Sequence, residues 1–216
     1  MSEYDHEPTR GLPGDLPPGE TIVWQGAPDW RVLARSALHT RLIAAYFAGC
    51  LALALAGGSM IGVAATVIGG ALVVALLTGF AWLVARTTVY TLTSRRIVLR
   101  IGVALNTCIN LPLDMIGAAD LRDRGNGFGD IALAPAAANR LGYLLLWPHA
   151  RPFHLRQAQP MLRAVPDAAN VAQMLARSRA ALAPVEQTPI EQTGVERTQA
   201  SPRPAMASAG LVEAAA

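Results

Sequence analysis

The feature that most constrains this chain is an uncharged run of 44 residues, at positions 42–85. The hydrocarbon core of a bilayer takes about 20 apolar residues per helix, so this run is long enough for two spans and a turn. A Gly-Gly-Ser step at positions 57–59 marks the turn, because glycine lets the backbone reverse without a side-chain clash. We therefore predict a transmembrane helical hairpin, with helices over residues 38–56 and 60–84. The alternative is a buried helical layer of a soluble protein.

The flanks of the hairpin predict its orientation. Arginines stand on both sides of the run, whereas the Gly-Gly-Ser turn has no charge: Arg31, Arg35, Arg41, Arg86, Arg95, Arg96 and Arg100. The positive-inside rule therefore places both termini in the cytoplasm of a multi-pass protein of the bacterial inner (intracytoplasmic) membrane. The N-terminus lacks the apolar stretch of a cleavable signal peptide. The run also contains no acid, base or histidine, which argues against a transporter or a channel.

Charge is spread unevenly along the chain. Residues 1–29 carry six acids and one Arg (−5), residues 30–163 carry thirteen Arg and four Asp (+9), and residues 164–216 carry four Arg and five acids (−1), which sum to +3. The basic part flanks the predicted hairpin, so membrane lipids are expected partners and nucleic acid is not.

Small residues recur along the hairpin at spacings that let helices approach closely in lipid. We expect them to pack the two spans against each other, with self-association or a third helix as the alternative. The candidate helix-packing residues are Ala48, Ala52, Gly58, Gly62, Ala65 and Gly69.

Four segments follow from the pattern of the whole chain. They are an acidic N-terminal segment with a short Trp-containing strand (1–36), the hairpin (37–85), an all-β domain (86–182) and a disordered tail (183–216). Residues 31–39 are expected to begin the first helix of the hairpin. Alternating apolar residues predict about seven antiparallel strands, at 87–93, 96–101, 103–111, 116–122, 128–134, 141–147 and 152–156. A C-terminal helix is expected to open at Asp167 and to present one apolar face, formed by Val171, Met174, Leu175 and Leu182.

Three motifs in this chain resemble a known family. Gly-Glu-Thr-Ile-Val-Trp-Gln-Gly (19–26) precedes the hairpin, and Tyr-Thr-Leu-Thr-Ser-Arg-Arg (90–96) and Asn-Leu-Pro-Leu-Asp-Met-Ile (110–116) follow it. They resemble the bacterial membrane-associated PH domain, which implies a PH-like roll capped by the C-terminal helix.

The sequence of the N-terminal segment resembles a narrower group of proteins. Arg-Gly-Leu-Pro-Gly-Asp-Leu-Pro-Pro-Gly-Glu-Thr-Ile-Val-Trp-Gln-Gly-Ala-Pro-Asp-Trp (10–30) is similar to the photosynthetic complex (reaction centre) assembly proteins of purple bacteria. The resemblance implies a non-enzymatic, chaperone-like factor whose partners are reaction-centre subunits and light-harvesting 1 polypeptides. The alternative function is a general membrane-anchored PH-like module that binds anionic lipid headgroups or other membrane proteins.

Few side chains indicate a catalytic or metal-binding site. The four histidines, His6, His39, His149 and His154, share no metal-ligand spacing, and no nucleophile–base pattern is visible, so no catalytic, metal or cofactor site and no enzyme activity are predicted. His39 is expected at the membrane edge, with ligation of bacteriochlorophyll as the alternative, and His149 is expected on a surface loop. The candidate partner or headgroup contacts are Trp24, Trp30, Arg95, Arg96 and Arg100.

Overall fold

The computed structural model describes residues 11–103, 106–136 and 142–182. The tail expected to be disordered lies outside these residues, as does the whole second compact unit, Val185–Ala216. The first unit, Met1–Pro184, contains a helical hairpin and a β domain.

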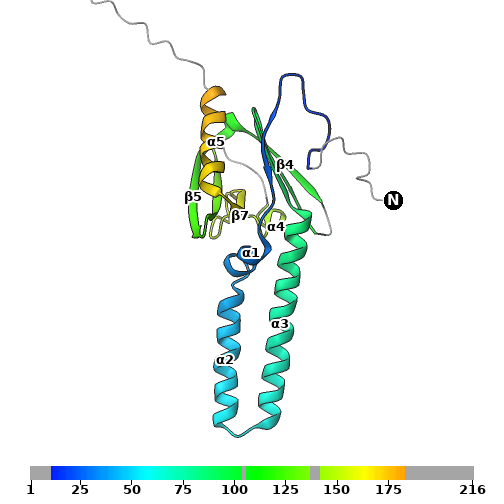
Figure 1. The fold of residues 1–216 in the computed structure, drawn as a ribbon, viewed down its shortest axis with the longest axis vertical. Helices are drawn as coiled ribbons and strands as arrows, with labels where there is room; N and C mark the ends of the chain where they lie inside the picture. Colours follow the sequence, from blue (N-terminus) through cyan, green and yellow to red (C-terminus); the bar gives the residue numbers. More distant parts are fainter. Residues whose placement is uncertain (1–10, 104–105, 137–141, 183–216) are drawn as a thin grey trace, which may run out of the picture. The chain divides into compact units, whose positions relative to one another are not determined.

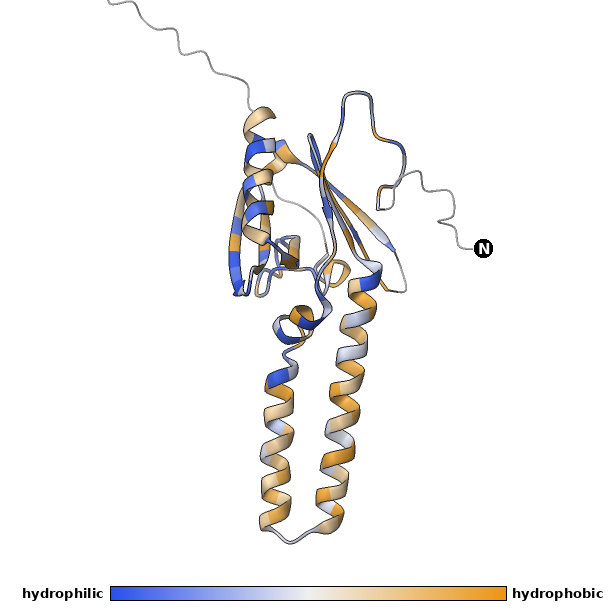
Figure 2. Ribbon diagram, in the orientation of Figure 1, coloured by the Kyte–Doolittle hydropathy of each residue, from blue (hydrophilic) through white to orange (hydrophobic). Residues whose placement is uncertain are grey.

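The predicted helix–turn–helix is confirmed (Figure 1). Helices α2 (Thr40–Ala56) and α3 (Met60–Thr87) contact each other along their length and are joined by residues 57–59. Gly58 adopts a φ of 67°, which a residue with a side chain rarely adopts, and the Ser59 hydroxyl accepts a hydrogen bond from the Gly62 N–H at 3.1 Å. Most residues of both helices are apolar (Figure 2), and many of their large side chains are exposed, so the hairpin offers apolar surface to its surroundings.

The two described helices of the hairpin differ in length. Helix α3 alone is long and apolar enough to cross a membrane. Helix α2 passes the same test only together with α1 (Trp30–Ser36), from which it is bent by 59°. At about 1.5 Å per residue, the 17 residues of α2 extend about 25 Å, slightly less than a bilayer core of about 30 Å.

The start predicted for the first helix is wrong. Residues 31–39 do not lead into α2, because α1 is a separate helix that ends at Ser36. The Asp29 carboxylate caps α1 by accepting a hydrogen bond from the Val32 N–H at 2.9 Å. The buried face of α1 packs on α3 and on the β domain, in a cluster of Leu33, Ala34, Ala81, Val84 and Ala164. This packing turns the chain away from the direction of α2.

The β domain consists of two antiparallel sheets. The first has the order β1 (Ile22–Gly26), β2 (Val89–Thr93), β3 (Arg96–Ile101) and β4 (Thr107–Pro112), and the second has the order β5 (Ile116–Gly125), β6 (Phe128–Pro135) and β7 (Met161–Pro166). A single 3-10 turn, η1 (Leu113–Met115), joins the sheets. The C-terminal helix α5 (Ala168–Leu182) contacts strands of both sheets. Its Val171 and Leu175 are buried in the core, and Met174 is partly buried, as the pattern predicted. Leu182, predicted on the same face, is 40% exposed because it is the last residue of the helix.

Two predicted strands are wrong. Tyr143–Leu146 forms a short helix, α4, in place of a strand at 141–147, and no strand forms at 152–156. The sheets are completed instead by β7 and by β1, which pairs with β2. Pro152 at the start of the second segment disfavours a strand there, because proline has no N–H to donate to a strand ladder.

Candidate functional site

The arginines predicted to form one headgroup site do not form a cluster. Arg95 lies in the turn between β2 and β3, whereas Arg100 lies at the other end of β3, opposite Val89. Strand β2 starts directly after α3, so the turn that holds Arg95 is one strand length away from the hairpin. The Arg96 Nε donates to the Glu20 Oε1 at 2.8 Å. The three side chains therefore do not converge on a single ligand.

Glu20 anchors the N-terminal segment to the β domain. It is buried and also accepts a hydrogen bond from the Thr93 hydroxyl at 2.6 Å. Burial raises the pKa of Glu20, but the hydrogen bonds from Thr93 and Arg96 outweigh it, and the net pKa lies below the ordinary value of 4.5. Glu20 and Arg96 thus serve a structural role.

The two tryptophans of the N-terminal segment lie in different surroundings. Trp24 on β1 is partly buried and packs against the core of the β domain. Trp30, the first residue of α1, remains half-buried, and the Arg31 guanidinium lies 4.9 Å from its ring centroid. Trp24 therefore contributes to the fold, and Trp30 remains available as a contact residue.

The small residues of the hairpin divide into three groups. A Cβ at Gly62 would lie 3.5 Å from the Ala54 Cβ, so Gly62 faces α2, while Gly58 forms the turn. Ala48, Ala52 and Ala65 are exposed, and a Cβ at Gly69 would meet no atom within 4 Å. The closest approach occurs at Gly70, which the pattern did not single out. A Cβ there would lie 2.9 Å from the Phe47 ring.

A shallow apolar groove of about 280 Å³ runs between α2 and α3; we call it the hairpin groove. Four of its lining residues, Ala44, Ala48, Gly70 and Ala71, are small, which allows a further helix to approach closely. The remaining lining residues are Phe47, Leu51, Thr66, Val67 and Val74. Ala48 is the member of the predicted packing set that lies in this groove.

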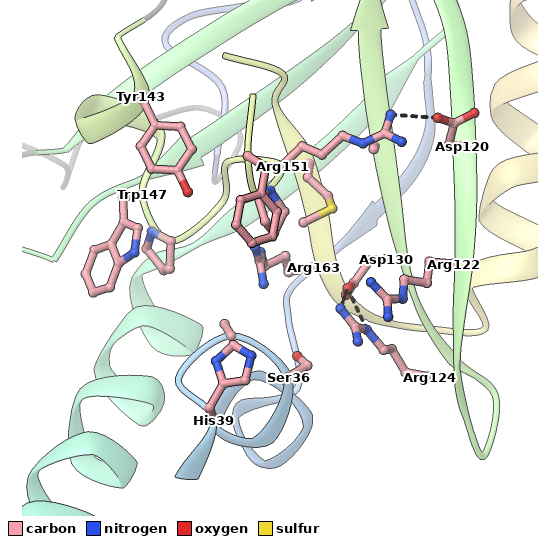
Figure 3. A pocket seen from close by; sticks show the side chains of 16 residues that line it. Ser36, His39, Asp120, Arg122, Arg124, Asp130, Tyr143, Trp147, Arg151 and Arg163 are labelled. Carbon is pink, nitrogen blue, oxygen red and sulfur yellow. Dashed lines mark hydrogen bonds and ion pairs between the residues drawn. The ribbon is translucent and has the colours of Figure 1, made fainter. Parts of the chain in front are cut away.

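A second cavity, which we call the junction cavity, lies where the hairpin meets the β domain. Its volume is about 470 Å³, and it is formed by the end of α1 and the α1–α2 break, by strands β5–β7, and by α4 with the loop that follows it. The residues labelled in Figure 3 are Ser36, His39, Asp120, Arg122, Arg124, Asp130, Tyr143, Trp147, Arg151 and Arg163.

Two ion pairs form between residues that line the junction cavity (Figure 3). The Arg124 Nε donates to the Asp130 Oδ2 at 2.7 Å, and the Arg151 Nη1 donates to the Asp120 Oδ2 at 2.6 Å. Asp130 is fully buried and also accepts a hydrogen bond from the Ala164 N–H at 2.9 Å. Both carboxylates are therefore neutralised by neighbouring arginines.

The cavity holds two arginines beyond these pairs. Arg122 on β5 is exposed, and no side-chain hydrogen bond or ion pair to its guanidinium is formed within the described part of the chain. Arg163 on β7 is only 6% exposed, and its Nη2 donates to the Ala150 carbonyl at 2.9 Å. Burial lowers the pKa of Arg163, while the nearby Asp130 opposes this shift.

A buried polar network lies behind the cavity and corrects the prediction that His149 is on the surface. His149 is 1% exposed; its Nδ1 lies 2.7 Å from the Tyr90 hydroxyl and its Nε2 lies 3.2 Å from the Thr88 hydroxyl. The Tyr90 hydroxyl also accepts a hydrogen bond from the Arg163 N–H, so the best-satisfied assignment has Tyr90 donating to Nδ1 and a protonated Nε2 donating to Thr88. Burial, followed by the charge of Arg163, lowers the pKa of His149 to about 3, so the ring is neutral.

Exposed apolar side chains surround the loop that borders the junction cavity. Phe153 is 97% exposed and Leu144 is 89% exposed, and both Trp147 and Leu155 also present apolar surface. The Trp147 ring stacks on Phe80 of α3, with centroids 5.5 Å apart. Trp147 and Phe153 both line the junction cavity, and exposed apolar side chains at one place are typical of contact with a membrane or a partner.

The arginines of the junction cavity were not recognised in the sequence, since they come from separate strands and a loop. The sequence offered one indication: residues 116–163 contain six arginines, including Arg122, Arg124, Arg151 and Arg163, but only three acids. Among residues 11–103, 106–136 and 142–182, no group of three or more His, Cys, Asp or Glu residues is placed to hold a metal ion. The chemistry that this region offers is therefore the binding of anions and of apolar groups.

Comparison with known proteins identifies the family. The sequence model described as the bacterial PH domain matches residues 42–179, a range that begins in α2 and ends in α5. An uncharacterized 23.7 kDa protein in the puhA 5′ region of Rhodobacter capsulatus is 39% identical over 192 residues, which cover 82% of this chain and 87% of that relative. No solved structure is significantly similar to the chain. The chain belongs to the bacterial PH domain family.

Proposed function

We propose that the protein is a membrane-anchored, non-enzymatic assembly factor for the photosynthetic reaction centre and its light-harvesting 1 complex. The hairpin crosses the bacterial inner membrane twice, both termini lie in the cytoplasm, and the β domain lies at the cytoplasmic surface. The observation that carries the proposal is the apolar hairpin, whose large apolar side chains are mostly exposed while its base packs against α1 and the β domain.

The relative supports the photosynthetic part of the proposal. Its description places it in the 5′ region of puhA, and its 39% identity extends over most of both chains. The segment at 10–30 resembles the reaction-centre assembly protein PuhB of purple bacteria.

The geometry suggests how such a factor would act. The hairpin groove offers small residues to a transmembrane helix of a client subunit, because close backbone approach is a main source of helix association in lipid. The exposed side chains of Leu144 on α4 and Phe153 on the following loop would contact the part of the client near the membrane surface. Contacts of this kind would cover the client until its permanent partner replaces them.

Removal of the gene tests this function. A deletion strain grown photosynthetically is expected to contain less reaction centre and light-harvesting 1 complex than the parent strain, measured by membrane absorption spectra and by subunit abundance. Normal abundance and normal assembly kinetics in the deletion strain would contradict the proposal.

Two matched variants locate the contact in that strain. Ala48→Leu fills the hairpin groove, whereas Ala52→Leu adds the same side chain one turn away, at an exposed position outside the groove. Both changes preserve helix propensity and apolar character. Ala48→Leu is expected to restore less reaction centre than Ala52→Leu, and equal restoration would show that the groove does not hold the client.

A further inference from the structure

We propose that the junction cavity binds the phosphate group of an anionic phospholipid. Arg163 and Arg122 supply the positive charge, and the site differs from the Arg95–Arg96 turn, which the structure places elsewhere. The assignment rests on the proposed membrane position of the hairpin.

The charges that line the cavity do not balance. Four arginines and two aspartates line it, which gives a formal charge of +2 before His39 is counted. The pairs Arg124–Asp130 and Arg151–Asp120 account for both acids. The excess therefore resides on Arg122 and Arg163, and a phosphate diester or monoester would compensate it.

Two buried polar atoms without partners point to the same place. Within the described residues, the buried side-chain polar atoms that lack a hydrogen-bond partner are the Ser36 Oγ and the Arg163 Nε, and both residues line the junction cavity. Figure 3 shows Arg163 and His39 facing each other across the cavity, with Ser36 beside them. A buried unsatisfied donor destabilises the protein, and an anion that accepts from it removes this cost.

The start of α2 adds a favourable field. This 17-residue helix follows His39, which makes no side-chain cap, so its first N–H groups have no side-chain acceptor at the cap position. The partial positive charge at a helix N-terminus favours an anion there.

The surroundings favour a lipid as the source of the phosphate. His39 directly precedes α2, and α2 enters the membrane in the proposed orientation, so the cavity lies at the depth of the headgroups. Helix α4 exposes Leu144 and the loop that follows it exposes Phe153, and both side chains suit the boundary between headgroups and acyl chains. Inorganic phosphate has no apolar part that could contact these side chains, whereas a phospholipid has acyl chains.

Binding of short-chain lipid to the full-length protein in maltoside detergent tests the inference. Dihexanoyl phosphatidylglycerol, dihexanoyl phosphatidylcholine and inorganic phosphate are each titrated, and tryptophan fluorescence is recorded, because Trp147 lines the cavity. The phosphatidylglycerol is expected to bind more tightly than either of the other two.

Three variants complete the test. Arg122→Gln is expected to raise the dissociation constant for phosphatidylglycerol by at least about tenfold, which corresponds to about 1.4 kcal/mol. Arg163→Gln is expected to raise this dissociation constant at least as much. If the change at buried Arg163 prevents folding, the exposed Arg122→Gln variant still tests the proposal. Arg177→Gln removes the same charge from an exposed position on α5, outside the cavity, and is expected to bind as the unaltered chain does.

Three results would overturn the inference. They are equal binding of phosphatidylglycerol and phosphatidylcholine, binding of inorganic phosphate as tight as that of the lipid, and an Arg122→Gln variant that binds like Arg177→Gln. These measurements use the isolated protein and do not depend on reaction-centre abundance. A failure here is therefore distinguishable from a failure of the proposed assembly function.

Discussion

The helical hairpin and the β domain use apolar side chains in opposite ways. Helix α2 has no buried residue and α3 has three, Gly70, Ala81 and Val84, although both helices are almost entirely apolar. The β domain buries its apolar residues in one core, which includes Leu99 and Leu133 at 0% exposure. One part of the chain is thus stabilised by packing inside itself, while the other part requires an apolar environment.

This difference shows where each part obtains its stability. Burial of a large apolar side chain contributes roughly 1.5–3 kcal/mol, and the β domain gains this contribution without a partner. The hairpin gains it only when lipid or another protein covers it. Substitutions that are harmless on an ordinary exposed surface should therefore be harmful on the hairpin.

The largest effect is expected in the core of the β domain. Leu133→Ala should lower the free energy of unfolding by about 2–5 kcal/mol, because it removes a fully buried side chain and leaves a cavity. Urea unfolding of the detergent-solubilised protein measures the change. Leu121→Ala, at a more exposed position on the same sheet, should change it by less than about 0.5 kcal/mol. Similar losses for the two variants would mean that Leu133 is not in a packed core.

Introducing a charged side chain should affect membrane insertion when it is placed in the hairpin but not when it is placed on the β domain. Ile68 is exposed about a third of the way along α3, and Ile68→Arg should oppose membrane insertion by up to about 2.5–3.5 kcal/mol, the cost at a helix centre. Carbonate extraction of membranes measures the fraction inserted. Leu121→Arg, on the exposed face of β5, is the matched control and should leave insertion unchanged. If Ile68→Arg is tolerated equally well, the hairpin is not in the membrane.

Acid should weaken the β domain through His149. Its pKa is about 3 in the folded protein and about 6.5 when unfolded, so the unfolded chain binds the extra proton between these values. Stability is therefore complete above pH 6.5 and should fall by about 1.4 kcal/mol per pH unit as the pH drops below it. Unfolding midpoints at pH 7, 6, 5 and 4 measure the slope, and a flat profile from pH 6 to pH 5 would show that His149 is not buried as a neutral ring.

A smaller effect is expected at Glu20. Glu20→Gln should lower the free energy of unfolding by about 1–3 kcal/mol at neutral pH, because it removes a charge-assisted hydrogen bond to Arg96. The lowered pKa of Glu20 means that its contribution is present above pH 4.5 and is lost as the pH falls through the folded value. Arg177→Gln at an exposed position on α5 is the control and should be neutral. A neutral Glu20→Gln would show that the ion pair does not hold the N-terminal segment.

Much of the fold followed from local patterns. The uncharged run, its Gly-Gly-Ser turn and the alternation of residues 87–101 each reflect a local rule, and the structure has the corresponding helices and strands. The errors arose where tertiary packing prevailed. Residues 31–36 left the line of α2 to pack on α3, and β7 formed in a segment whose prolines and Arg163 concealed its pattern.

The sites were harder to predict for a physical reason. Neighbours in sequence, such as Arg95, Arg96 and Arg100, are separated by the geometry of a β-hairpin, and one of them is bound to Glu20. Arg122 and Arg163 are distant in sequence and lie in one cavity only because β5, β6 and β7 form one sheet. A single sequence contains no local signal for such convergence.

The most direct test of the proposed assembly function is affinity purification of the tagged full-length protein from membranes of photosynthetically grown cells. The proposal predicts that reaction-centre subunits and light-harvesting 1 polypeptides co-purify, and that Ala48→Leu retains less of them than Ala52→Leu does. Recovery of the intact protein from these membranes without either class of polypeptide, under conditions that preserve membrane complexes, would contradict it.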